Sequence, residues 1–374
     1  MRGALLLNGN AGSVEQLVNQ AEPFLLGSRH EDSRVREART VLLVTAAWDA
    51  EHDESHVKRA INGAGLPSHH VDGYDRVIVN LSLATEMASV LAAESAVAEV
   101  LRESSLTRAR VRDLYLAHNV HLVAMLRRVL AEAQSLDPSI TLSELADRER
   151  SPSGNDATSL YRFALARELR HTLETLEGND DRMVELSAEL DRGALDAAGA
   201  LFAAAHQEAR ARLEARVLAA NVILVFGGNL DRLLGALRFF RLRDAFVEAL
   251  RRGAVIVGTS AGAMSLCERI IVYDDFARPS REFQLWERGL DIVRSLQLLP
   301  HCMERIQTDD PDNLAYLARR FRHRVCVGLN EGSFLFVDLA RQRAESVGRT
   351  DSVYVFGPHG DKHAYRAGEP IPLK

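Results

Sequence analysis

The chain has 374 residues and a mass of 41.4 kDa, with 46 lysines and arginines against 52 aspartates and glutamates. The formal net charge of -6 and a pI near 6.1 argue against nucleic acid as the default partner. A hydrophobic content of 47% beside 26% charged residues is typical of a folded soluble protein. No apolar run reaches the ~18 residues of a membrane span, so we expect no membrane partner.

The N-terminal segment indicates a β-strand rather than a leader. Arg2 and an apolar run over 4–7 begin the chain, but Asn8-Gly9-Asn10 ends that run too early for a signal peptide. The cysteines are odd in number, far apart and without C-x-x-C spacing, which argues against a disulfide framework or a structural zinc site; they are Cys267, Cys302 and Cys326. We therefore expect a cytoplasmic protein in a reducing compartment.

Short apolar runs bounded by turn-forming residues predict the buried strands of an α/β sheet. Three of them precede residue 83 and four follow residue 217, and helical stretches lie between them. The predicted strands are 4–7, 41–46, 75–81, 221–226, 254–257, 325–329 and 334–337. The fold class that this order indicates is α/β, with a mostly parallel central sheet flanked by helices.

Between the two halves, residues 83–217 are rich in Ala, Leu, Glu and Arg and predict helices. Apolar residues at three- and four-residue steps predict one buried helix face, made of Val111, Leu114, Tyr115, His118, Leu122, Met125 and Val129. A loop follows at 151–156, and a second helical run covers about 182–219. We interpret the chain as 1–82, the N-terminal part of the α/β domain; 83–217, a helical insertion that forms a small bundle; and 218–374, the C-terminal catalytic part.

The sharpest chemical signal is a G-x-S-x-G motif directly after an apolar strand. The strand 254–257 leads into Gly258-Thr259-Ser260-Ala261-Gly262-Ala263, and a helix can follow. A serine nucleophile needs such a strained strand-to-helix turn, because small flanking residues let the backbone close and expose the hydroxyl. The first amides of the helix then favour developing negative charge. An ordinary Gly/Ser turn is the alternative that this context disfavours.

A second glycine-rich loop follows the preceding strand, in Val225-Phe226-Gly227-Gly228-Asn229. Paired glycines let a backbone N–H approach a ligand atom closely. With the amide of Ala261, an amide of Gly227 or Gly228 would complete a two-donor oxyanion hole. A plain turn or a phosphate cradle is the alternative, but the full G-x-G-x-x-G fingerprint is absent.

These motifs together resemble the dipeptidase E and cyanophycinase group of serine peptidases, whose fold is similar to that of class I glutamine amidotransferases. Gly-Gly-Asn at 227–229, Leu233-Leu234 and the elbow at 258–263 carry the likeness. In that group a Gly-Leu segment and a catalytic His follow, as Gly289-Leu290 and His301 do here, and then a segment similar to Gly328-Leu329-Asn330-Glu331-Gly332. The resemblance covers about 4–80 loosely and 221–340 well.

The resemblance implies a serine hydrolase that cleaves a small peptide or isopeptide bond, with an aspartyl residue in the substrate. It implies Ser260 as nucleophile, His301 as general base and acid, and Glu331 as the group that orients His301. Asn229 is expected to contact substrate, and Arg305, or Arg281, to pair with an acidic side chain. Thr259 makes the elbow more similar to cyanophycinase than to dipeptidase E. No cofactor and no metal are implied.

Two departures from the group's pattern concern the substrate. His301 is followed by Cys-Met-Glu-Arg rather than an aromatic residue, with an acidic stretch at 308–312, and the insertion has no counterpart in small members. The acidic pair Asp274-Asp275 follows the elbow helix and could lie near the pocket. A solvated loop is the more common role of such a pair, so we assign it no function. His118 and His121 lack an obvious third metal ligand.

Three alternatives remain open at this point. An α/β-hydrolase would use the same elbow with Asp338 and then His359 or His363. A glutaminase is disfavoured because no cysteine has the small neighbours of an elbow. A non-catalytic binding or assembly protein on this scaffold would place its function in the helical insertion. The expected partner is a small peptide, and we expect a homodimer because dimers are the commonest oligomers.

Overall fold

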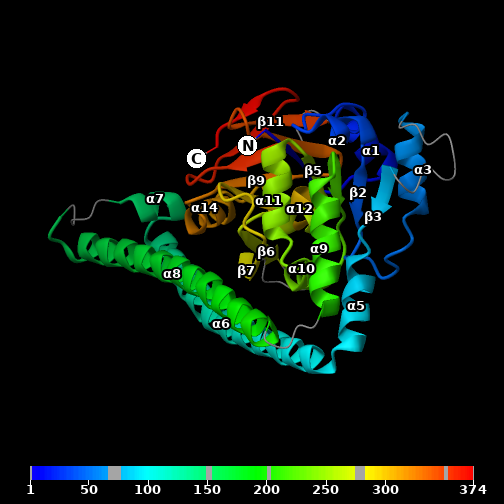
Figure 1. Ribbon diagram of the computed structural model, residues 1–374. Coiled ribbons are helices and arrows are strands. Elements are labelled where there is room, and N and C mark those ends of the chain that lie inside the picture. Colours follow the sequence, from blue (N-terminus) through cyan, green and yellow to red (C-terminus); the bar gives the residue numbers. More distant parts are fainter. Residues whose placement is uncertain are drawn as a thin grey trace.

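The computed structural model describes residues 2–65, 77–148, 154–199, 204–273, 283–348 and 353–373. It shows a mixed α/β protein in which a large central sheet is flanked by helices, with a long helical pair running along one side (Figure 1). No helix within these ranges is both long and apolar enough to span a bilayer. The expectations for Asp274-Asp275 and Arg281 fall outside the described residues, as do 75–76 of one predicted strand and 151–153 of the predicted loop.

The central sheet has eight strands in the order β14-β11-β10-β1-β5-β4-β2-β3. Its five parallel strands are β1 (Ala4–Asn8), β5 (Val255–Thr259), β4 (Val222–Val225), β2 (Val41–Val44) and β3 (Ile78–Asn80). Three antiparallel strands extend it beside β1, namely β10 (Ser333–Asp338), β11 (Arg343–Gly348) and β14 (Pro370–Ile371). The carboxyl ends of the parallel strands meet at one edge, which is where the predicted motifs lie.

Alternate residues of the parallel strands face the two helical layers, as the period of two in a strand requires. Leu5 and Leu7 pack in the core on the side of α10 (Leu230–Phe239), α11 (Arg243–Arg252) and α12 (Ala261–Leu266). Ala4 and Leu6 pack on the opposite side, beneath α1 (Val14–Leu26) and α3 (Ser55–Gly63). Because both faces are covered, these strands are continuously apolar. The short helix α2 (Ser33–Ala38) precedes β2.

One of the predicted strands lies in a second sheet rather than in the central one. The predicted strand 325–329 is β9 (Val325–Leu329), which pairs with β8 (Leu296–Pro300) in a four-stranded sheet. The predicted strand 334–337 joins the central sheet as β10, antiparallel to β1. A buried apolar run carries no information about strand direction or about which sheet a strand joins. The prediction that 325–329 and 334–337 are parallel strands of one sheet with the others was therefore wrong.

The remaining elements are β12 (Val353–Phe356), β13 (Lys362–Tyr365), the hairpin β6 (Arg269–Tyr273) and β7 (Phe283–Arg288), α13 (Cys302–Arg305) and α14 (Pro311–Arg320).

The described residues between β3 and β4 form helices joined by short connections. The helices are α5 (Leu83–Ala93), α6 (Ser95–Leu136), α7 (Leu142–Asp147), α8 (Ala157–Gly199) and α9 (Ala204–Leu218). Helices α6 and α8 lie side by side (Figure 1); with 42 and 43 residues they are each about 63 Å long. Helix α9 packs on α11, and α7 packs on α14.

The buried face of α6 differs from the predicted one. Leu114 is 73% exposed and Met125 is 43% exposed, whereas Asn119, Val123 and Leu126 are buried. The expectation that Leu114, His118 and Met125 lie on the buried face was therefore wrong. The physical reason is that Asn119 is buried, with its side-chain oxygen accepting a hydrogen bond from Asn179 of α8 at 3.1 Å, so a polar residue lies at the centre of the packed face.

Candidate active site

Ser260 stands at the turn between β5 and α12, at the carboxyl edge of the parallel sheet. Its backbone has φ 49 and ψ -117, a conformation that non-glycine residues rarely adopt. The Ser260 amide donates to the carbonyl of Asn8 on the neighbouring strand at 2.9 Å. The turn is thus the strained strand-to-helix elbow that the G-x-S-x-G motif predicts, and strain of this kind is typical of functional residues.

The glycines of the elbow are required by close packing. A Cβ added to Gly262 would lie 2.1 Å from the carbonyl oxygen of Val225, and one added to Gly258 would lie 2.9 Å from the Cα of Ala263. Both distances are shorter than side chains tolerate, so α12 can approach β4 and β5 only without side chains at these positions.

Replacing Gly262 by Ala is expected to displace the elbow. Overpacking of this kind costs about 1–3 kcal/mol of unfolding free energy, and a shift of ~1 Å at Ser260, the predicted nucleophile, is expected to cost about 100-fold in activity. Gly235→Ala in α10 is the matched control, because a Cβ there meets nothing within 4 Å; it should be neutral or stabilise by up to ~1 kcal/mol. Urea unfolding measures the loss of stability, and the rate of the catalysed reaction measures the loss of activity. Equal behaviour of the two variants would contradict the packing argument.

His301 follows the last residue of β8 and has its side chain next to the elbow serine. Its Nε2 lies 3.3 Å from Ser260 Oγ. The residue has φ 55 and ψ 37, and it precedes α13 directly. Because β8 belongs to the second sheet, the pair joins two separate sheets across the site. The predicted nucleophile and base are therefore brought together.

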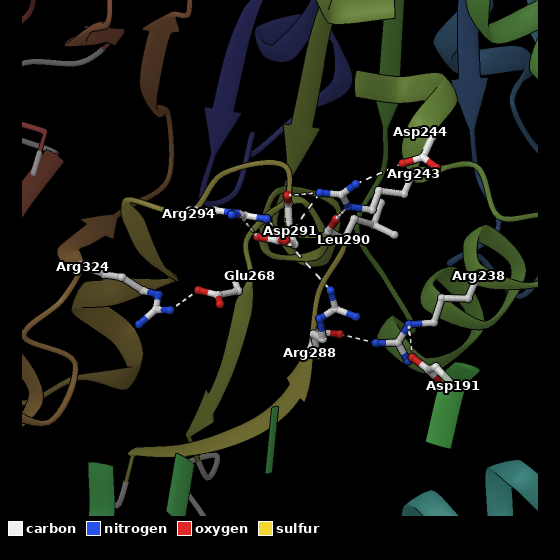
Figure 2. Close-up of polar contacts among 10 residues, drawn as sticks. All are labelled: Asp191, Arg238, Arg243, Asp244, Glu268, Arg288, Leu290, Asp291, Arg294 and Arg324. Atoms are coloured by element: carbon white, nitrogen blue, oxygen red, sulfur yellow. Dashed lines mark hydrogen bonds and ion pairs between the residues drawn. The ribbon is translucent and has the colours of Figure 1, made fainter. Parts of the chain in front are cut away.

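The turn that leads into β8 is fixed by an arginine cluster around Asp291 (Figure 2). Arg294 donates to both carboxylate oxygens of Asp291, from Nε at 2.8 Å and from Nη2 at 2.7 Å. Arg243 donates from Nε to the carbonyl of Leu290 at 2.8 Å. Asp291 is buried and has φ 56. This network anchors the chain segment before β8, the strand that ends at His301.

The carboxylate beside the other imidazole nitrogen is Glu304. Its Oε2 lies 3.5 Å from His301 Nδ1, and its side chain is 57% exposed. The predicted Glu331 lies in the turn between β9 and β10, bridged to Asn10, with its side chain against Gly12. Sequence reasoning missed Glu304; its position one turn after His301 in α13 was the available signal. The role of Glu331 stays a prediction.

Two of the predicted oxyanion-hole residues, Gly227 and Ala261, lie beside Ser260. A Cβ on Gly227 would lie 2.9 Å from the Ser260 Cβ and 3.3 Å from the amide nitrogen of Ala261. Gly228 has φ 136, and a Cβ there would lie 2.5 Å from the carbonyl oxygen of Ala47. Ala261 is the first residue of α12, where helix amides have no intrahelical partner. The positions needed for two amide donors are therefore adjacent.

Asn229 and Arg305, the predicted substrate-binding residues, follow Gly228 and His301 closely in the chain. Asn229 caps α10, because its Oδ1 accepts from the amide of Arg232 at 3.0 Å. Arg305 is half-buried in α13, and its amide donates to the carbonyl of His301 at 3.1 Å. Part of the Asn229 side chain is thus used for the helix cap.

Two asparagines that sequence reasoning did not single out support the site. The Asn8 side chain is buried, donates to the carbonyl of Ser333 at 2.7 Å and accepts from the hydroxyl of Thr259 at 3.3 Å. Asn330 Oδ1 accepts from the amide of Met303 at 2.8 Å and holds the start of α13. Their positions directly after or at the ends of strands were the signal that could have identified them.

The three cysteines are buried and not paired. Burial raises the pKa of Cys267 and of Cys302 to about 12, so their thiols are almost entirely protonated at neutral pH. We expect iodoacetamide at pH 8 to modify neither residue in the folded protein, and both after unfolding in guanidinium. Mass spectrometry of the peptides measures this, and rapid labelling of Cys302, next to His301, in the native state would argue against it.

The residues of the α/β-hydrolase alternative pair elsewhere. Asp338 binds Arg29 at 3.0 Å, His359 lies 3.5 Å from Asp147, and His363 packs on Tyr365. Within the described ranges, no group of three or more His, Cys, Asp or Glu is placed to hold a metal ion.

The class of protein that the family comparison supports is a serine-type peptidase. Residues 194–343 match the model of Peptidase family S51. The serine-type peptidase and the resemblance to the dipeptidase E group are thereby confirmed over this region. No curated protein matches the chain.

Two solved structures are similar to the chain. A peptidase from an acI-B1 actinobacterium is 14% identical over 99% of this chain and 97% of its own, with a TM-score of 0.46. A putative peptidase E protein from Listeria monocytogenes EGD-e is 12% identical over 93% of this chain and 99% of its own, with a TM-score of 0.37.

Proposed function

We propose that the chain hydrolyses a small peptide or isopeptide bond through an acyl-enzyme on Ser260. The proposed substrates contain an aspartyl residue. The observation that carries the proposal is the 3.3 Å contact between Ser260 Oγ and His301 Nε2 on a strained elbow. A serine hydroxyl is a weak nucleophile until a base accepts its proton, and this distance suits that transfer after slight closure on substrate.

In the proposed reaction, Ser260 Oγ bonds to the scissile carbonyl carbon while His301 Nε2 accepts the hydroxyl proton. The oxyanion accepts hydrogen bonds from the amides of Ala261 and of Gly228 or Gly227. His301 then donates the proton to the leaving amine as the C–N bond breaks, which leaves an ester on Ser260. Water, deprotonated by His301, hydrolyses that ester and restores the serine.

A carboxylate at Nδ1 would hold the imidazole tautomer and stabilise its charged form. Glu304 lies 3.5 Å from that atom, and Glu331 remains the residue that the family resemblance indicates. An acidic substrate side chain needs a cation, and Arg305, four residues after His301, is the proposed partner, with Asn229 as a second contact.

The test is labelling of the full chain with a fluorophosphonate probe, beside Ser260→Ala and His301→Ala, followed by a panel of α- and β-aspartyl dipeptides with alanyl dipeptides as controls. Labelling that vanishes in both variants, with turnover of one aspartyl class, supports the proposal. Labelling without aspartyl turnover would keep the serine hydrolase and reject the substrate class. Absence of both would overturn the catalytic assignment.

The residues around the imidazole are tested in the same assay. If Glu304 orients His301, Glu304→Gln should lower kcat about 10- to 100-fold with little change in KM, and Glu331→Gln should not. The reverse result would assign the role to Glu331. Arg305→Ala should raise KM for aspartyl substrates and leave alanyl substrates unchanged.

A further inference from the structure

The outward face of α6 carries most of the exposed large hydrophobic side chains found in the described residues. Leu106, Leu114, Val120 and Met125 of this helix are between 43% and 73% exposed. The opposite face, with Asn119 and Leu126, packs against α8. The exposed side of α8 is instead rich in charge, for example at Arg167, Glu174, Arg182 and Glu189. The exposed side of α8 therefore has the charged composition of a solvent-facing surface, whereas the exposed side of α6 is unusually apolar.

The exposed residues of α6 form a continuous stripe. We define the α6 stripe as seven residues at steps of three and four, namely Arg110, Leu114, Ala117, His121, Met125, Arg128 and Glu132. At 3.6 residues per turn these positions fall in a sector about 80° wide, centred close to the direction opposite Asn119. All seven are exposed or half-buried, and small Ala117 near the middle allows another helix to approach closely.

The order of charges along the stripe is suited to an antiparallel copy of itself. With a two-fold axis at His121, Arg110 faces Glu132 of the partner subunit, and Glu132 faces the partner's Arg110. Leu114 faces the partner's Arg128, whose aliphatic stem covers it, and Ala117 faces the partner's Met125. A parallel copy would instead set Arg110 and Arg128 against themselves. Arg110 forms no ion pair within the described residues, so its charge is available.

The apolar surface continues beyond the end of the stripe. Leu160 and Tyr161, at the start of α8, are 46% and 45% exposed, and the Tyr161 hydroxyl donates to Glu132 Oε2 at 3.5 Å. Two-fold symmetry places this extension at both ends of the contact. Four of the seven large exposed hydrophobic residues in the described part of the chain, Leu114, Met125, Leu160 and Tyr161, therefore lie on one self-complementary surface.

We propose that two copies of this chain associate through the α6 stripe, antiparallel, with the two-fold axis at His121. The stripe spans 22 residue steps, about 33 Å along the helix. The association does not depend on the proposed peptidase activity, because the stripe lies on the side of α6 that faces away from the rest of the chain.

The test measures the mass of the full chain by sedimentation and light scattering at concentrations up to about 100 μM. The wild type should run as a dimer, at twice the 41.4 kDa of one chain. Leu114→Asp should weaken the dimer at least ~10-fold, as should Arg110→Glu and Glu132→Arg singly. The double variant Arg110→Glu with Glu132→Arg should restore dimerisation, because the swap recreates both ion pairs only between antiparallel copies.

Arg182→Glu, on the charged face of α8, is the control and should leave the mass unchanged, and circular dichroism should show that every variant stays folded. A monomeric wild type would overturn the proposal. A dimer that survives Leu114→Asp, or a double variant as weak as the single ones, would also overturn it, since either result places the interface or its register elsewhere.

Discussion

Replacing His301 by Gln should lower kcat by about 10⁴- to 10⁶-fold, with a small change in KM, for whichever dipeptide of the panel the wild type cleaves. His301 Nε2 lies 3.3 Å from Ser260 Oγ, so the substitution removes the proposed base for the hydroxyl proton, which is also the proposed acid for the leaving amine. Gln keeps a polar side chain of similar length at a residue with φ 55, so the elbow and its amides remain in place.

His323→Gln is the matched control, because His323 is 68% exposed and pairs with Glu177 away from the elbow. It should leave kcat within about twofold. The double variant Ser260→Ala with His301→Gln should be no slower than either single variant, since the two residues act as one unit. If His301→Gln keeps a tenth or more of the wild-type kcat, another base activates Ser260 and the assignment is wrong.

The sequence predicted the contact between Ser260 and His301 because this contact depends on local rules. Gly258 and Gly262 flank a serine after a buried strand, and the structure shows why no larger residue fits at either position. The spacing from Gly289 to His301 is short enough for one strand, β8, to carry the histidine back to the elbow. Local strand and turn chemistry, together with the resemblance, was therefore sufficient for the pair.

The carboxylate expected to orient His301 is harder to predict, because its identity depends on distances in space rather than along the chain. Glu304 and Glu331 are separated by α14 and β9, yet both belong to segments that border the same edge of the structure. Chain spacing cannot rank two such groups, since small changes in the α13 turn move a carboxylate by several ångströms. The family pattern indicated Glu331, and the geometry places Glu304 beside Nδ1.

The packed face of α6 was missed for a different physical reason. Hydrophobic periodicity assumes that polar residues face water, but Asn119, which the predicted face does not include, is buried on the inward face of α6. The Tyr115 hydroxyl donates to Asp180 of α8, and burial raises the pKa of this phenol. A pattern that counts only apolar residues therefore selected a face rotated toward Leu114 and Met125, which lie outside.

Asp180 is the centre of the most deeply buried ion pair that the structure describes. Arg320, at the end of α14, donates from Nε to Asp180 Oδ2 at 2.8 Å and from Nη2 to Oδ1 at 2.7 Å. Both side chains are fully buried. The remaining Arg320 nitrogen donates to the hydroxyl of Tyr316 at 2.7 Å. The pair thus ties the middle of α8 to the helix that packs on the second sheet.

Asp180→Asn should lower the free energy of unfolding by about 3–5 kcal/mol, because it leaves the Arg320 guanidinium charged and buried without a counter-ion. Glu99→Gln is the control, since Glu99 and Arg102 form an exposed pair on α6 with side chains 59% and 61% exposed, and it should cost less than ~1 kcal/mol. Urea unfolding followed by circular dichroism measures both changes.

A double-mutant cycle separates the ion pair from simple loss of packing. Arg320→Met removes the buried charge, so Asp180→Asn added to Arg320→Met should cost much less than Asp180→Asn alone, with a coupling of about 1–3 kcal/mol. Additive costs would mean that the two groups are stabilised by their separate surroundings rather than by each other. In that case the tyrosines, rather than the ion pair, would hold α8 against α14.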